Sequence, residues 1–261
     1  MKAFLEGLYL VYNRRELVSP DPLEFLYNYG ELPDREVAGL VASCLAYGRV
    51  AQILKSVEKI LTPLGPRPRD FLLQNPSDLR HALSKAYENF KHRFTDGEHM
   101  ADLLARASGI ISAYGSLEEF MGSCLREGGS TLSALNIFSR ALSPSREGFS
   151  MLSSPEDGSA CKRLFLYLKW MVRHDEVDPG GWTVLSPKDL VMPTDTHIHN
   201  IARQLGLTER KQADLKTALE ITRAFAVFSP EDPTRYDFAL SRFGIRGALR
   251  ISDLIRLKCE N

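Results

Sequence analysis

Two lysines occupy positions that favour covalent chemistry. Lys162 and Lys169 lie in 158-GSACKRLFLYLKWMVR-173, and a spacing of seven residues brings two helical side chains within ~20° of one another. Phe165 and Leu166 share that face, so we expect the face to be buried. Burial disfavours the charged ammonium, and a neutral lysine amine is a nucleophile.

The start of this helix adds to that expectation. Gly158 and Ser159 provide an N-cap, which places Lys162 in the first turn, where the positive end of the helix dipole also favours the neutral amine. A solvated face whose lysine stems cover apolar surface is the alternative interpretation. Because 162–173 carries four positive charges and no acid, the strip would also suit phosphates.

An aspartate begins a second helix in 192-MPTDTHIHNIARQLGLT-208. Asp195 or Thr194 is the natural N-cap, and an aspartate that only caps contributes ~1 kcal/mol. Asp195, His197 and His199 are also metal-ligand types. Helical residues two apart point about 200° apart, so both histidines face one ion only if this turn is extended.

Helices must position these residues, because apolar side chains recur at three- and four-residue intervals and sustained alternation is missing. The fold should be almost entirely helical, with two long loops at 142–160 and 174–195. Beyond a core helix at the N-terminus, we expect about ten helices. They are at 34–49, 50–65, 77–90, 97–113, 116–126, 130–141, 160–173, 197–206, 210–227 and 231–242.

Composition indicates a soluble globular chain and excludes disordered and collagen-like classes, with 44% hydrophobic and 25% charged residues. The 33 basic and 33 acidic residues give no net charge over the whole chain. The charges are unevenly distributed, however, and 162–173 and 242–258 carry excess positive charge. No signal peptide or membrane span is expected. Four scattered cysteines offer no zinc or iron–sulfur ligand run and indicate a reduced, cytoplasmic protein.

The two segments together resemble a known superfamily. The run Pro193-Thr194-Asp195-Thr196-His197-Ile198 is similar to a step in the helix-hairpin-helix DNA glycosylases, of which endonuclease III is a member. Most of the chain also resembles a bacterial family of uncharacterised proteins, marked by SACKRL…LKWMVR, D-T-H and DPTRYDFAL…FGI. The lysine helix looks closest to the archaeal 8-oxoguanine DNA glycosylases, where a second Lys follows the nucleophilic Lys by one heptad.

This resemblance implies an all-α, two-lobed fold of the glycosylase type in one compact unit. A central lobe would span approximately 46–189 and end in the hairpin-helix, and 1–45 plus 190–261 would form the second lobe. The hairpin at 152–160 departs from the usual leucine-proline-glycine-valine-glycine form, since only Gly158 remains. Cys259 alone cannot bind the iron–sulfur cluster of endonuclease III, so we expect no cofactor.

The resemblance also implies a base-excision enzyme with abasic-site lyase activity, acting on an oxidised purine such as 8-oxoguanine. Lys162 would attack the sugar, Asp195 would stabilise positive charge and move a proton, and Lys169 would lie deeper in the same groove. The expected partner is damaged double-stranded DNA, or single strands or RNA, bound by a monomer. The DNA-binding candidates are Gly158, Ser159, Arg163, Arg173 and His197.

Two other functions stay open, a catalytically silent nucleic-acid-binding relative and a metal-dependent hydrolase built on Asp195, His197 and His199. For the aromatics and the loop that are candidates for base stacking, core packing is the favoured interpretation. They are Tyr167, Trp170, Phe94 and 180–182. Other basic clusters could follow a DNA backbone, although a solvated face is the default. They are Arg67 and Arg69, 91–93, and Arg242, Arg246, Arg250 and Arg256.

Overall fold

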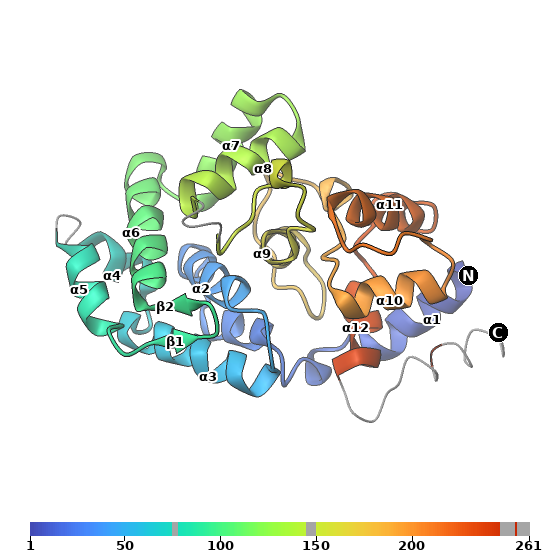
Figure 1. Cartoon of the computed structure of the whole chain (residues 1–261), viewed down its shortest axis with the longest axis horizontal. Coiled ribbons are helices and arrows are strands. Elements are labelled where there is room, and N and C mark those ends of the chain that lie inside the picture. The colour runs from blue at the N-terminus through green and yellow to red at the C-terminus, as the bar shows by residue number, and fades with distance from the viewer. Residues whose placement is uncertain (75–77, 145–149, 246–253, 255–261) are drawn as a thin grey trace. The chain divides into compact units, whose positions relative to one another are not determined.

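The computed structural model describes residues 1–74, 78–144, 150–245 and 254, and these are predominantly α-helical (Figure 1). The all-α class predicted from apolar spacing is confirmed. The helices are α1 (Lys2–Tyr12), α2 (Leu32–Cys44), α3 (Val50–Leu61), α4 (Pro68–Gln74), α5 (Leu79–Ala86), α6 (Gly97–Tyr114), α7 (Leu117–Gly128), α8 (Thr131–Leu142), α9 (Lys162–Val172), α10 (Thr196–Gln204), α11 (Leu215–Ala226) and α12 (Asp237–Ile245). Strands β1 (Lys91–His92) and β2 (Thr95–Asp96) form an antiparallel hairpin.

The helices predicted from periodicity are present, with shifts at their ends. The helix expected at 210–227 begins at Leu215, because the Asp214 carboxylate accepts the Thr217 N–H and caps the helix there. Periodicity missed α4 and the hairpin, since a seven-residue helix and two-residue strands are too short to show a period. None of the described helices has both the length and the apolar content to cross a bilayer.

The chain divides into two compact units. Unit 1 consists of Met1–Val18, Asp157–Gly180 and Leu185–Asn261, and unit 2 consists of Ser19–Glu156 and Gly181–Val184. These boundaries differ from those expected near residues 45 and 189. Helix α2 falls in unit 2 because it packs against α3, α4 and the preceding 3-10 helix. Helix α9 falls in unit 1, where its buried cations pair with carboxylates.

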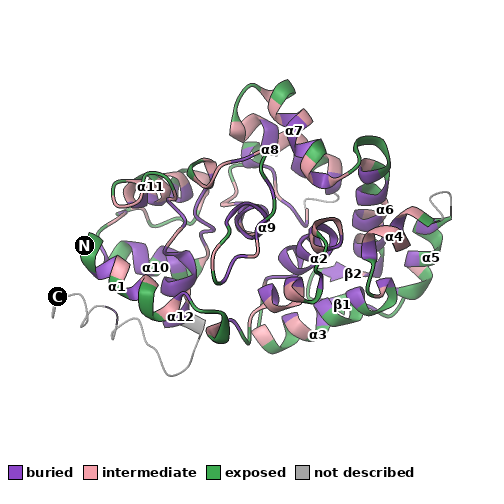
Figure 2. Cartoon of the chain, turned by 180° about the vertical axis from the view of Figure 1, so that it is seen from behind, coloured by how far each residue is buried: buried purple, intermediate pink, exposed green. Residues whose placement is uncertain are grey.

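Helices α1, α10, α11 and α12 of unit 1 share a hydrophobic core. Helix α12 contacts both α1 and α10, and Figure 2 shows their buried faces. Burying one large aliphatic side chain contributes about 2 kcal/mol. This core therefore holds α10 in place, and with it Asp195, which precedes the first residue of α10. Its buried residues are Phe4, Leu5, Leu8, Met192, Ile198, Ile201, Ala202, Leu205, Ile221, Phe225, Tyr236, Ala239, Leu240, Phe243 and Leu254.

A buried carboxylate anchors Gly181–Val184 within unit 2. Glu36 of α2 accepts the backbone N–H of Leu117 at 3.2 Å and of Glu118 at 2.9 Å, and the indole N–H of Trp182 at 2.7 Å. Burial raises the pKa of Glu36 to about 7, although these three donors act to lower it. Glu36 thereby joins α2, the start of α7 and the returning segment.

The raised pKa of Glu36 predicts a pH-dependent stability. Between the ordinary value of 4.5 and about 7, the folded chain retains a proton that the unfolded chain has released, so the free energy of unfolding falls as pH rises. Across this window the wild type should lose about 3 kcal/mol relative to Glu36→Gln, which cannot titrate. Urea unfolding at successive pH values measures this difference. Parallel pH profiles for the two proteins would contradict the prediction.

Candidate active site

Lys162 and Asp195 form an ion pair within unit 1. Lys162 Nζ lies 3.2 Å from Asp195 Oδ2, and the side chains are 32% and 28% exposed. An amine and a carboxylate at this distance satisfy the geometric condition for passing a proton between them. Their partial exposure leaves both groups accessible to a reactant. The two residues singled out from separate sequence segments therefore lie together.

The turn before α9 is hydrogen-bonded to the start of α11. Gly158 adopts φ +74°, a left-handed conformation suited to glycine, and its carbonyl accepts the Leu215 N–H at 3.0 Å. Ser159 forms an isolated antiparallel bridge with Asp214. The backbone immediately before Lys162 is thus hydrogen-bonded to the capped start of α11.

Cys161 joins this turn directly to Lys162. It adopts φ +48°, and a non-glycine residue in this region costs on the order of 1 kcal/mol, so its surroundings must impose the conformation. Burial raises the pKa of the Cys161 thiol to about 12. The neighbouring sulfur therefore stays protonated and does not compete with the lysine as a nucleophile.

Asp195 uses its two carboxylate oxygens for different partners. Oδ1 accepts the N–H groups of His197 and Ile198, each at 2.9 Å, and so caps α10, while Oδ2 faces Lys162. Burial acts to raise the pKa of Asp195, but the charge of Lys162 and the Ile198 N–H outweigh it and lower the pKa. Capping and a functional carboxylate, the two sequence interpretations, are therefore compatible.

Replacing Asp195 should separate these two roles. Asp195→Asn keeps an acceptor at the N-cap, so the free energy of unfolding should fall by less than about 1 kcal/mol. Asp195→Ala removes the acceptor and should cost about 1–2 kcal/mol. Urea unfolding measures both variants, with exposed Thr196→Ala as the neighbouring control. Equal losses for the Asn and Ala variants would remove the capping role.

Lys169, one heptad after Lys162, occupies a different environment. It is 1% exposed, and its Nζ lies 2.8 Å from Asp237 Oδ2 and 3.5 Å from Asp178 Oδ1. Burial acts to lower the pKa of Lys169, but the two carboxylates outweigh it and raise the pKa. This corrects the expectation that Lys169 acts on the nucleotide from deeper in the same groove as Lys162, because the ammonium is buried and has no surface to offer a nucleotide.

Arg173 extends the same buried cluster. Its guanidinium contacts Asp178, and it lies 2.9 Å from both Asp175 and Asp232. Because Arg173 is 3% exposed and surrounded by carboxylates, it cannot meet a DNA phosphate, which corrects that prediction. The buried charge cluster consists of Lys169, Arg173, Asp175, Asp178, Asp232 and Asp237.

The remaining DNA-binding candidates lie at the surface beside the ion pair in sequence. Gly158 and His197 are exposed, and Ser159 and Arg163 are partly exposed. They stay predictions for phosphate contact. In another basic cluster, Arg67 lies 3.3 Å from Asp70.

The predicted basic stripe near the C-terminus is described only at its first residue. Arg242 is 1% exposed and donates to the Leu17 carbonyl at 3.3 Å, so it does not form a solvent-facing stripe. Arg246, Arg250 and Arg256 lie outside the described residues.

The proposed metal ligands do not converge. His199 is 6% exposed and its Nε2 lies 2.9 Å from the Arg210 carbonyl, whereas His197 is exposed. Across the described ranges, no group of three or more His, Cys, Asp or Glu side chains has a metal-binding arrangement. The geometry therefore gives the hydrolase hypothesis no ligand set among these residues.

Among the aromatic stacking candidates, three are packed in the interior. Tyr167, Trp170 and Trp182 are 0%, 1% and 3% exposed, which confirms core packing. Phe94 is the exception at 66% exposed, so core packing is wrong for this residue. Its place at the tip of the β-hairpin explains the difference, because two-residue strands show no period in the sequence from which the hairpin could be predicted.

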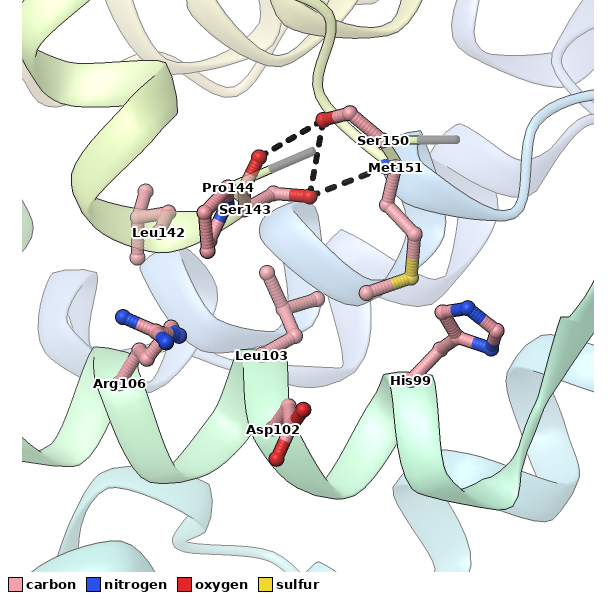
Figure 3. A pocket seen from close by; sticks show the side chains of 9 residues that line it. All are labelled: His99, Asp102, Leu103, Arg106, Leu142, Ser143, Pro144, Ser150 and Met151. Carbon is pink, nitrogen blue, oxygen red and sulfur yellow. Dashed lines mark hydrogen bonds between the residues drawn. The ribbon is translucent and has the colours of Figure 1, made fainter. Parts of the chain in front are cut away.

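Unit 2 contains a small pocket, whereas the ion pair lies in unit 1. Ser143 and Ser150 bond to one another on one wall, with their Oγ atoms 3.1 Å apart, and His99 and Arg106 lie opposite (Figure 3). Its volume of about 20 Å³ suits a single water molecule and excludes a nucleobase. The lining residues are His99, Asp102, Leu103, Arg106, Leu142, Ser143, Pro144, Ser150 and Met151.

Comparison with known proteins yields one family. Residues 21–246 match the family described as "Protein of unknown function (DUF2400)". No curated protein and no solved structure matches the chain. The matched region includes both Lys162 and Asp195.

Proposed function

The chain belongs to the DUF2400 family, and we propose that it is a DNA base-excision glycosylase with abasic-site lyase activity. The observation that carries this proposal is the 3.2 Å approach of Lys162 Nζ to Asp195 Oδ2 at a partly exposed site. A nucleophile paired with a proton acceptor is the minimum that covalent catalysis requires. The same two residues carry the resemblance to the helix-hairpin-helix glycosylases.

In the proposed reaction Asp195 first accepts a proton from the Lys162 ammonium, which frees the amine. The amine nitrogen then bonds to C1′ of a flipped nucleotide, while the bond from C1′ to the base breaks and its electron pair leaves with the base. Asp195 passes the proton it holds to the departing base, and the carboxylate so regenerated stabilises the positive charge on the amine-bearing sugar. The Asp195 carboxylate takes one proton from the new amine and gives it to O4′ as the C1′–O4′ bond breaks, so that the ring opens and the nitrogen lone pair forms the C=N bond of a protonated Schiff base. Loss of the C2′ proton to water then breaks the C3′–O bond, whose electron pair leaves with the 3′ phosphate.

The local backbone supports a hairpin-helix interpretation. The left-handed turn at Gly158 and Cys161 leads straight into α9, so the backbone turns sharply immediately before Lys162. A helix start and the nearby side chain of Arg163 are suited to an anionic group such as a DNA phosphate. We therefore propose the glycosylase-type fold and a DNA partner for the protein.

The proposed substrate is an oxidised purine such as 8-oxoguanine, and the protein acts as a monomer without a cofactor. This choice rests on the resemblance of the lysine helix to the archaeal enzymes. Lys169, the second lysine, is enclosed by carboxylates. Only Lys162 and Asp195 therefore still support that resemblance.

Borohydride trapping tests the function directly. Wild-type protein is incubated with duplexes that carry 8-oxoguanine or an abasic site, and borohydride reduces any Schiff base to a stable adduct. An adduct that needs borohydride supports the proposal. Salt-dependent binding without an adduct would instead identify a silent nucleic-acid-binding relative. If the wild type neither binds DNA or RNA nor forms an adduct with them, a nucleic-acid function is rejected.

A further inference from the structure

The β1–β2 hairpin of unit 2 presents an aromatic side chain and a cation to solvent. Lys91 pairs with Asp96 and His92 with Thr95, so Arg93 and the neighbouring Phe94 form the two-residue loop. Phe94 is 66% exposed, far more than the interior aromatics described above. The hairpin lies beside α3, with which β1 is in contact (Figure 1).

The base of this hairpin is held rigidly. His92 is fully buried, with Nδ1 2.9 Å from Ser56 Oγ and Nε2 2.9 Å from the Tyr47 carbonyl. The Tyr47 hydroxyl lies 2.7 Å from the His92 carbonyl and 2.9 Å from Thr95 Oγ1. Because both strands are hydrogen-bonded to Tyr47, the tip keeps a defined position without help from a partner.

The tip retains a strained backbone around a placed cation. Arg93 has φ +53°, a conformation that costs on the order of 1 kcal/mol for a non-glycine residue. Its guanidinium carbon lies 5.7 Å from the Phe94 ring centroid and 5.9 Å from that of Tyr47. A Cβ on Gly48 would come within 3.2 Å of Arg93 Cδ, so that glycine makes room for the arginine stem. A two-residue hairpin loop requires this backbone conformation, and here an exposed arginine adopts it where glycine is the usual residue.

The charge around Phe94 suits an anionic, aromatic partner. Lys91 and Arg93 of the hairpin are both exposed. The nearby acid Asp96 caps α6 and bonds to His99, whose Nδ1 is 2.6 Å away. An exposed ring flanked by cations is the arrangement with which proteins stack on nucleobases and neutralise adjacent phosphates. A purely apolar partner would gain nothing from these two cations.

We propose that Phe94 is a base-stacking residue: its ring stacks on a nucleobase, and Arg93 and Lys91 contact the adjacent phosphates. This inference rests on the proposed function in taking nucleic acid as the partner. It adds a binding element in unit 2 that is distinct from the residues proposed for the chemistry in unit 1.

Fluorescence and affinity test this inference with the full-length protein. Phe94→Trp places an indole at the tip, and stacking on a base should quench its emission, whereas the native Trp170 and Trp182 are buried. Phe94→Ala should weaken binding to an abasic-site duplex about tenfold in an anisotropy titration. Tyr114→Ala, which removes another exposed aromatic of unit 2, is the matched control and should bind as the wild type does.

The outcomes separate the two proposals. Quenching and weakened binding without any trapped adduct would support stacking and reject the glycosylase. An adduct together with unquenched emission from the Phe94→Trp variant and unchanged Phe94→Ala affinity would reject stacking and leave the glycosylase intact. No DNA binding by wild type or by Phe94→Trp, with folding confirmed by circular dichroism, would overturn the stacking role.

Discussion

Lys162→Gln is expected to abolish the borohydride-trapped adduct and to slow base release by on the order of 10³-fold or more, because it removes the covalent nucleophile. The amide of Gln cannot form a Schiff base with C1′. Gel electrophoresis of trapped complexes measures the adduct, and single-turnover kinetics measure base release. An adduct that survives Lys162→Gln would assign the nucleophile to another residue.

Two matched variants show that such a loss comes from the amine itself. Lys162→Arg keeps a positive charge facing Asp195, but a guanidinium stays protonated and should be as inactive as Gln. Lys211→Gln removes an exposed lysine of the same unit and should trap as the wild type does. Full trapping by Lys162→Arg would contradict the nucleophilic role and favour a purely electrostatic one.

Lys169→Met is expected to lower the free energy of unfolding by about 3–5 kcal/mol, since it leaves the buried Asp237 carboxylate without its cation. Asp237 loses its cation at 2.8 Å, Asp178 loses a cation at 3.5 Å but keeps Arg173, and neither carboxylate is open to solvent. Lys162→Met is the matched control, because the same substitution at a partly exposed pair should cost less than about 1 kcal/mol. Urea unfolding followed by circular dichroism measures both variants.

A double-mutant cycle tests the cause of that loss. Adding Asp237→Asn to Lys169→Met removes one uncompensated charge, so the double variant should be more stable than the sum of the single losses predicts. Strict additivity, or equal losses for Lys169→Met and Lys162→Met, would show that the buried charge cluster does not hold α9 in place.

The buried charge cluster also connects stability to the site. Lys169 joins α9 to Asp237 of α12, and α12 packs against α10, whose first residue follows Asp195. Contacts inside unit 1 therefore keep Lys162, at the start of α9, close to Asp195. Lys169 is thus a positioning residue for the proposed reaction.

The sequence by itself determined what depends on neighbours along the chain. Apolar spacing located the helices other than α4, and the residue types before α10 placed Asp195 at an N-cap. Lys162 lies in the first turn of α9 as expected, but the N-cap is Cys161 and the prediction of Gly158 and Ser159 there was wrong. These features follow from hydrogen bonds and side-chain contacts within a few residues. They offered both members of the ion pair as candidates, and the resemblance to the glycosylases selected them.

Only the tertiary structure decided which of those residues reach solvent. Helical periodicity gives the direction in which Lys169 points, but the carboxylates that enclose it come from Asp178 and Asp237, far along the chain. Phe94 was equally ambiguous, since its exposure depends on a hairpin fastened by Tyr47 and Ser56. Burial depends on what packs against a side chain, and residues distant in sequence determine that.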